Sequence, residues 1–186
     1  IADQYLVMAY TDRKQQQAKD VHGITAFIVE RGWKGVEPYD LKGKLGVRAG
    51  VTGGELFKQV EIPAANVLGG LGEGFKVAMS ALDNGRYTVA AGCVGLIKAC
   101  LDASVKYAHE RQASGKEIGK HQLVQQMIAF MVQSADLGDL LVRKCGWMKN
   151  RGQRCTREVS MAKWTNTVNS LQCADHAIEI HGAYGY

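Results

Sequence analysis

The sequence predicts an α+β fold that is mostly α: a partial antiparallel β-domain followed by three long helices of an up-down bundle. The first third of the 186 residues alternates short apolar runs with glycine-containing turns, which is typical of short strands. The remainder contains no proline after Pro63, and its apolar residues recur every three or four positions over long stretches. We place the domain boundary between residues 67 and 68, giving a β-domain over 1–67 and an incomplete helical domain over 68–186.

The β-part is predicted from runs of apolar and β-branched residues. Tyr5–Ala9 is a short apolar run, and Gly23–Glu30 is the strongest strand signal because it is rich in β-branched and aromatic residues. The polar stretch Thr11–Asp20 between them is predicted to be an exposed hairpin loop. Two further strands are predicted at Lys44–Arg48 and Glu55–Ile62. Together these strands make a small antiparallel sheet or part of a barrel.

A glycine-rich connector, Asn66–Gly74, joins the two parts. It invites comparison with phosphate-binding loops, but it lacks the Gly-Lys-Ser/Thr ending of a P-loop. A linker that then caps a helix is the favoured interpretation.

The first long helix is predicted over Glu73–Arg111, about 57 Å at ~1.5 Å per residue. Its glycines cost stability in a helix, so we expect them to serve close helix packing or the approach of a ligand. Arg86 and Arg111 stand about 37 Å apart along its axis. No small ligand reaches both in one copy of the chain, so either two ligands bind or one long ligand crosses more than one subunit. The glycines in question are Gly85, Gly92 and Gly95.

Two more helices are predicted over His121–Lys149 and Thr156–Ile180. Each carries an apolar stripe with the helical period, expected to face a partner helix. Three helices leave one face of a bundle open, and a fourth helix or another subunit is expected to cover it. The stripes are Val124, Met127, Ile128, Met131 and Ala135 in the first, and Met161, Trp164, Val168, Leu171, Ala174 and Ile178 in the second.

Composition excludes several classes of function. The net charge of +5 is scattered, which suits an anionic small molecule better than nucleic acid, because no basic cluster with interleaved aromatics occurs. The five cysteines are odd in number and form no C-x-x-C, so we expect buried thiols in a reducing compartment. No uninterrupted run of about 18 apolar residues predicts a membrane span. No metal-ligand spacing and no secretory signal is visible, and the first residue, Ile1, suggests a fragment or a processed chain.

Three local features could carry chemistry, and each has a plain structural alternative. Asp83-Asn84-Gly85-Arg86 places an anion and a cation one helical turn apart beside a residue without a side chain, or is a simple ion pair. Arg111 before a turn, with Gln122 at the start of the next helix, makes an anion site, or is an arginine favoured by the helix dipole. The final stretch 181–186 offers backbone groups in a small-residue turn, or is a helix C-cap.

Taken together and in order, these segments resemble the acyl-CoA dehydrogenase family. The stretches 44–48, 55–57 and 60–63 are similar to the end of that family's middle β-domain, and 66–75 to the entry of its helical domain. The stretch Leu82–Arg86, followed by 90–92, resembles the first long helix; Asn84–Tyr87 leans toward the glutaryl-CoA dehydrogenase branch. Tyr107 to Gln122 and Ile180–Tyr186 resemble the next two signatures.

The resemblance implies a four-helix bundle, of which this chain would hold three helices, and an N-terminal helical domain absent from it. It also implies an FAD-dependent homotetramer that oxidises an acyl-CoA to the 2,3-enoyl-CoA. The electrons would pass to an electron-transferring flavoprotein. The expected location is the bacterial cytoplasm or the mitochondrial matrix.

Carried over residue by residue, the resemblance assigns the acyl-CoA contacts to Asp83, Asn84, Gly85 and Arg86. It assigns FAD contacts to Arg111 and Gln122, and to a backbone stretch that meets FAD from a neighbouring subunit: Glu179, Ile180, His181, Gly182 and Ala183.

Departures from the family pattern qualify these assignments. Gly85 stands where some branches place the catalytic glutamate, so we expect no catalytic base in this chain and a base beyond Tyr186. Ser114 replaces a phenylalanine, Glu179 a glutamine and Ala183 a glycine, and these changes put FAD affinity in question. The alternative function is a non-catalytic helical scaffold that keeps the bundle without a functional flavin.

Overall fold

The computed structural model describes residues 2–186, which form two compact units. The first unit ends at Ala81 and the second comprises Leu82–Tyr186. This division falls inside the long helix α2 (Gly74–Glu110), and each unit is described by itself below.

The first unit holds two small antiparallel sheets. In the three-stranded sheet β2 (Ile24–Glu30) lies between β1 (Gln4–Tyr10) and the short β5 (Val67–Leu68). Strands β3 (Val36–Asp40) and β4 (Gly53–Phe57) form the second sheet. The predicted antiparallel β-part is therefore confirmed, and its two strongest strands, β1 and β2, lie where the sequence predicts them.

The predicted hairpin loop Thr11–Asp20 is confirmed, since it joins the antiparallel strands β1 and β2 and is mostly exposed. It also contains a short helix that was not predicted, α1 (Arg13–Gln17), whose first backbone N–H groups donate to the Asp12 side chain. Two other local predictions in this unit are wrong. Lys44–Arg48 is a loop rather than a strand: Val47 has a φ of 51° and the Lys44 ammonium donates to the Val47 carbonyl at 2.9 Å. The strand predicted over Glu55–Ile62 ends at Phe57, and Gln59 with a φ of 51° turns the chain away. Strand β3 was missed because it contains Pro38, which demotes a strand signal.

The glycine-rich connector is fastened to β2. The Gly72 amide donates to Thr25 Oγ1 at 3.0 Å, and the Asn66 side-chain amide donates to the Ile28 carbonyl at 3.0 Å. Glu73 then accepts from the Gly70 amide at 3.0 Å, immediately before α2 begins. These contacts favour the interpretation of a structural linker that leads into a helix.

Gly74 allows the start of α2 to touch the backbone of β2. A Cβ added at Gly74 would lie 2.6 Å from the Thr25 carbonyl carbon and 2.8 Å from the Ala26 amide nitrogen, and neither backbone atom can move without disturbing the sheet. We expect Gly74→Ala to lower the free energy of unfolding by about 1–3 kcal/mol through overpacking. Gly95→Ala is the matched control in the same helix, because a Cβ there meets nothing within 4 Å. Helix propensity should make that variant more stable by about 0.5–1 kcal/mol. Urea denaturation of both variants would check the pair, and equal stabilisation by both would contradict the close contact at Gly74.

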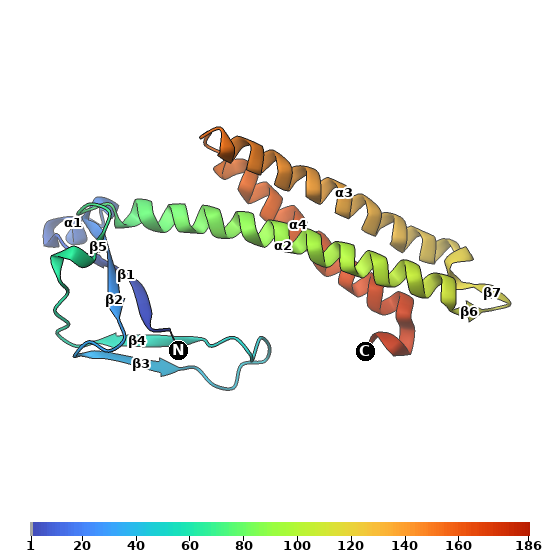
Figure 1. The fold of residues 1–186 in the computed structure, drawn as a ribbon, viewed down its shortest axis with the longest axis horizontal. Helices are drawn as coiled ribbons and strands as arrows, with labels where there is room; N and C mark the ends of the chain where they lie inside the picture. The colour runs from blue at the N-terminus through green and yellow to red at the C-terminus, as the bar shows by residue number, and fades with distance from the viewer. Residues whose placement is uncertain (1) are drawn as a thin grey trace. The chain divides into compact units, whose positions relative to one another are not determined.

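The second unit is built from α2, α3 (Gln122–Asn150) and α4 (Thr156–His181). A short hairpin, β6 (Gln112–Ala113) and β7 (Lys116–Glu117), connects α2 to α3 (Figure 1). Four short 3-10 turns, at Val21–Gly23, Ala64–Asn66, Ile118–Lys120 and Gly182–Gly185, complete the chain. The predicted helices Glu73–Arg111, His121–Lys149 and Thr156–Ile180 are thus confirmed to within one or two residues at each end.

Two clusters of buried side chains hold the three helices together. One lies toward the α3–α4 turn and the other toward the hairpin, and each draws residues from all three helices or their caps. The first comprises Ala90, Cys145, Cys155, Val159 and Ala162, and the second Ile97, Met131, Ala135, Cys173 and Ile180. All five cysteines are free thiols, and burial raises the pKa of Cys145 and Cys173.

The predicted apolar stripe of α3 is confirmed, whereas that of α4 is wrong. In α3, Met131 and Ala135 are buried in the second cluster and the rest of the stripe packs against it. In α4 the predicted stripe is exposed except for the half-buried Ala174. Smaller residues on the opposite face pack instead: Val159, Ala162, Asn166, Ser170, Cys173 and Ile180.

The three glycines in the middle of α2, unlike Gly74 at its start, do not serve close packing within residues 2–186. A Cβ at Gly85, Gly92 or Gly95 would meet nothing within 4 Å. Close approach of a ligand or of another chain remains their predicted role. Among the described helices α2 alone is long and apolar enough on average to suggest a membrane span, although no uninterrupted apolar run occurs. Core helices of soluble bundles share this length and composition, so the feature does not distinguish a span from a bundle helix.

Candidate functional site

Asp83 and Arg86 form an ion pair near the α3–α4 turn, and the Asp83 carboxylate is also bound from α4. The Arg86 guanidinium donates to Asp83 Oδ1 at 2.8 Å, and the Thr156 hydroxyl at the start of α4 donates to Asp83 Oδ2 at 2.9 Å. The side chains of Arg86 and Asp83 are 38% and 28% exposed. The predicted ion pair is therefore present. Its carboxylate also accepts a hydrogen bond from α4, so the pair is more firmly positioned than an isolated surface pair.

Asn84 is held in the same way from α3. The Lys149 ammonium donates to Asn84 Oδ1 at 2.8 Å and lies 5.7 Å from the centre of the Tyr87 ring. Tyr87 packs against the first buried cluster, and Gly146 makes room for it, since a Cβ there would lie 2.7 Å from the Tyr87 hydroxyl. The segment 83–87 thus has a fixed orientation toward the α3–α4 turn.

Lys149 and Thr156 were missed by sequence reasoning. They lie 65 and 73 residues from their partners, and a lysine or threonine near a helix end carries no local signal. Only the antiparallel return of α3 and α4 along α2 could have indicated the contact.

Arg111 and Gln122 flank the β6–β7 hairpin at the other end of the bundle. Arg111 follows α2 directly, its carbonyl accepts from the Ile118 amide at 2.9 Å, and its exposed side chain makes no ion pair with any of residues 2–186. Gln122 is the exposed first residue of α3. Ser114 and Gly115 have φ angles of 52° and 76°, so Ser114 stands in a left-handed position of the two-residue turn.

Glu117, the acidic residue of the β6–β7 hairpin, is paired with two basic side chains. Hydrogen bonds from Lys120 and then from His109 hold the pKa of Glu117 below its usual value. Glu117 therefore stays ionised and paired at neutral pH. The Arg111 guanidinium has no acidic partner among residues 2–186 and is exposed to an external anion.

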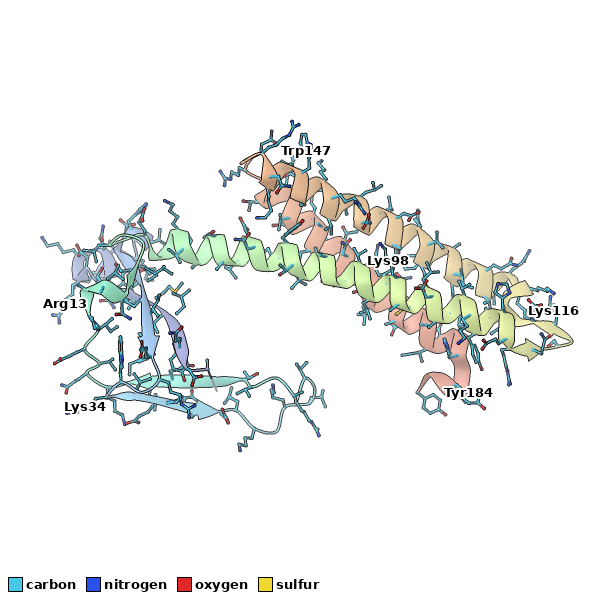
Figure 2. All side chains as sticks on the ribbon, viewed as in Figure 1. Arg13, Lys34, Lys98, Lys116, Trp147 and Tyr184 are labelled. Carbon is cyan, nitrogen blue, oxygen red and sulfur yellow. The ribbon has the colours of Figure 1, made fainter. Side chains whose placement is uncertain are left out.

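The end of α4 reaches the same place. The His181 ring stacks on Tyr107, one turn before Arg111, with ring centres 4.4 Å apart. The Tyr184 ring, labelled in Figure 2 just beyond the end of α4, lies 6.4 Å from Tyr107. Gly182 ends the helix with a φ of 58°. The structure therefore brings the last turn of α4 and Arg111 together around Tyr107.

The remaining residues of this stretch divide between the interior and the surface. Ile180 is buried in the second cluster, and Ala183 is exposed. Glu179 Oε2 lies 3.5 Å from His176 Nδ1, one turn back along α4. The carboxylate that replaces the family's glutamine thus has a cationic partner when His176 is protonated.

The two groups of residues are far apart along α2. Helix α2 is continuous from Gly74 to Glu110, so Arg86 and Arg111 lie about 37 Å apart along its axis, at ~1.5 Å per residue. The first group comprises Asp83, Asn84 and Arg86 with Lys149 and Thr156. The second comprises Arg111, Gln122 and 179–183, and no single small ligand spans both.

Comparison with known proteins places the chain among acyl-CoA dehydrogenases. Residues 72–186 match the family model described as acyl-CoA dehydrogenase, C-terminal domain. The chain is 38% identical over 187 residues to glutaryl-CoA dehydrogenase of Desulfococcus multivorans, covering 100% of this chain and 47% of that protein.

Solved structures agree in fold along the whole chain. Butyryl-CoA dehydrogenase from Megasphaera elsdenii matches with a TM-score of 0.90 at 36% identity, over 100% of this chain and 47% of its own. A chain in the structure of the electron transferring flavoprotein of Acidaminococcus fermentans matches with a TM-score of 0.90 at 38% identity, over 100% of this chain and 48% of its own. The chain spans about half the length of the proteins that it resembles.

Proposed function

The chain belongs to the acyl-CoA dehydrogenase family, and we propose that its protein oxidises an acyl-CoA thioester to the 2,3-enoyl-CoA with FAD as the cofactor. The observation that supports the proposal is that two groups of polar and cationic residues lie about 37 Å apart along α2, each in a segment that resembles the family's. One end suits the substrate and the other the cofactor.

The acyl-CoA end is the segment Asp83–Arg86. Arg86 within the segment and Thr156 of α4 each donate to one carboxylate oxygen of Asp83, and Lys149 of α3 donates to the amide oxygen of Asn84, so the segment is fixed before any ligand arrives. The adjacent turn between α3 and α4 adds the exposed cations Arg151 and Arg154, whose charge suits the phosphates of a CoA nucleotide. Gly85 has no side chain that could remove a proton, so this position does not supply the general base.

The residues at the opposite end fit FAD. The free Arg111 guanidinium can bind a pyrophosphate bidentately, the Gln122 amide can hydrogen-bond beside it, and the turn 182–183 exposes a backbone edge next to the Tyr107–His181 stack. Glu179 opposes this only weakly, since its carboxylate turns toward His176. Bound there, FAD would supply the hydride acceptor for the oxidation.

The separation of the two ends implies an assembly. One copy would contribute Arg86 to its own substrate site and Arg111 to the flavin site of a neighbour, as in a homotetramer. We propose an electron-transferring flavoprotein as the electron acceptor, supported by the likeness to a chain in the A. fermentans flavoprotein structure.

The visible spectrum of the complete protein tests this function against a flavin-free scaffold. We expect an absorption band near ~450 nm from bound flavin, which bleaches on anaerobic addition of an oxidisable acyl-CoA. A thioester without an α-hydrogen, such as pivaloyl-CoA, is the control and should leave the band unchanged. A protein that is purified without flavin and takes up none from added FAD would instead be the non-catalytic scaffold.

A further inference from the structure

The turn between α3 and α4 holds two consecutive residues of α2 from its two ends. Lys149, one residue before the end of α3, donates to Asn84 Oδ1 at 2.8 Å. Thr156, the first residue of α4, donates to Asp83 Oδ2 at 2.9 Å. The turn itself is closed by backbone hydrogen bonds of 2.9 to 3.1 Å between residues 148 and 153. Both contacts to α2 therefore come from a turn whose own shape is fixed.

The hydroxyl of Thr156 serves α2 rather than its own helix. A threonine at the start of a helix commonly caps that helix, but here Cys155 occupies the N-cap position and the Thr156 hydroxyl donates to Asp83. By contrast, the hydroxyls of Thr88 and Thr167 donate to carbonyl groups of their own helices. Because a β-branched side chain is stiff at χ1, the direction of the Thr156 hydroxyl is well defined.

Two hydrogen bonds from different helices fix the plane of the Asp83 carboxylate. The terminal torsion of an aspartate side chain is broad and roughly two-fold, so a single bond from Arg86 would let the two carboxylate oxygens exchange. Thr156 takes Oδ2 and leaves Oδ1 for the Arg86 guanidinium at 2.8 Å. Arg86 makes no other side-chain hydrogen bond within residues 2–186. Asp83 is therefore the group that sets the direction of the guanidinium.

We infer that Thr156 is a positioning residue for substrate binding: through Asp83 it sets the direction in which Arg86 presents its remaining donors to an acyl-CoA. An arginine side chain has five N–H donors, and Asp83 takes one of them. The others stay available for a ligand, and the 38% exposed side chain can reach it. The inference rests on the proposed function, since it takes Arg86 as a contact of the acyl-CoA.

A double-variant cycle in the complete, FAD-loaded protein tests the positioning role. Acetyl-CoA is the probe, because it keeps the thioester but has no β-carbon and cannot be oxidised to an enoyl-CoA. We expect Thr156→Val, which keeps the branched shape and removes the donor, to raise the dissociation constant about 3- to 10-fold in calorimetric titrations. In the Arg86→Ala background the same change should have no further effect, because the hydroxyl acts through Arg86. Thr156→Ser, which restores the hydroxyl, should bind acetyl-CoA nearly as the wild type does.

Thr167→Val is the matched control, because the Thr167 hydroxyl contacts only its own helix. It should leave the affinity for acetyl-CoA unchanged. The flavin content of Thr156→Val should equal that of the wild type, since Arg111 lies at the far end of α2.

Three results would overturn the positioning role. They are wild-type affinity in Thr156→Val, an equal loss on adding that change to Arg86→Ala, and a loss of flavin from Thr156→Val, which would indicate general damage to the bundle. If Arg86→Ala itself leaves the affinity unchanged, the acyl-CoA segment of the proposed function fails, and the role of Thr156 fails with it. A normal loss for Arg86→Ala beside an unchanged Thr156→Val refutes the positioning role alone.

Discussion

Replacing Asn166 with aspartate is expected to lower the free energy of unfolding by about 3–5 kcal/mol at neutral pH, although the two side chains have the same shape. Asn166 is completely buried at the centre of the three helices. Its amide nitrogen donates to the Ala90 carbonyl of α2 at 3.1 Å and to the Gly138 carbonyl of α3 at 3.3 Å. Aspartate would replace this donor with an acceptor facing two other acceptors.

The surroundings of Asn166 cannot adapt to the new charge. Its Oδ1 atom is buried without a hydrogen-bond partner, so no donor waits nearby. A Cβ at Gly138 would lie 3.0 Å from that oxygen, which shows how closely α3 approaches. An ionised carboxylate would be left unpaired in the interior, and that cost is the physical basis of the expected loss.

The loss should depend on pH with a definite sign. Burial raises the folded-state pKa of the introduced carboxyl above its unfolded value of about 3.9. Below about pH 4 both states are protonated and the variant is least destabilised; as the pH rises toward the folded pKa the destabilisation grows. Denaturant unfolding at pH 4 and pH 7 measures the difference.

Asn169→Asp provides the control on the same helix. Asn169 is only half-buried, so its carboxylate can stay hydrated and the stability should change by about 0.5 kcal/mol or less. A loss for Asn166→Asp that is equally small, or that does not change with pH, would contradict the buried bridge between the helices.

The same helix shows where sequence reasoning succeeds and fails. The period of α3 identified its buried face because only one of its faces combines apolar character with regular spacing. In α4 the outward line of Met161, Trp164, Val168 and Leu171 is more hydrophobic than the buried line, which includes Asn166 and Ser170. A hydrophobicity pattern ranks the faces of a helix by the size of their apolar side chains. It cannot distinguish a face buried within the chain from an exposed face that another chain could cover.

The candidate site follows a similar division. The segments Asp83–Arg86, Arg111 and 179–183 were identified from the sequence as motifs, and their roles remain proposals. The hydrogen bonds that hold the segment Asp83–Arg86 in place were not predictable, because Thr156 and Lys149 donate to Asp83 and Asn84 from other helices. Contacts between residues so distant in sequence depend on the relative positions of the helices. A local sequence pattern does not determine those positions.

The two arginines of α2 should separate substrate binding from cofactor binding in the complete protein. We expect Arg111→Ala to weaken FAD binding by about 10- to 100-fold, the loss of one charge-assisted contact to phosphate. Acyl-CoA affinity of the FAD-loaded variant should stay close to wild type. Arg86→Ala should do the reverse, because it removes a cation from the acyl-CoA segment and leaves Asp83 with Thr156 alone.

Flavin content after dialysis, titration with FAD and titration of the loaded protein with acyl-CoA separate the two effects. Lys106→Ala is the matched control, since Lys106 is an exposed cation on the same helix between the two arginines. It tests whether loss of any positive charge from α2 weakens binding. Because the helix holds Arg86 and Arg111 about 37 Å apart, a ligand in a single pocket cannot contact both. Equal losses of FAD from Arg86→Ala and Arg111→Ala would therefore mean that the cofactor does not bind at the hairpin end, and the assignment of the two ends would fail.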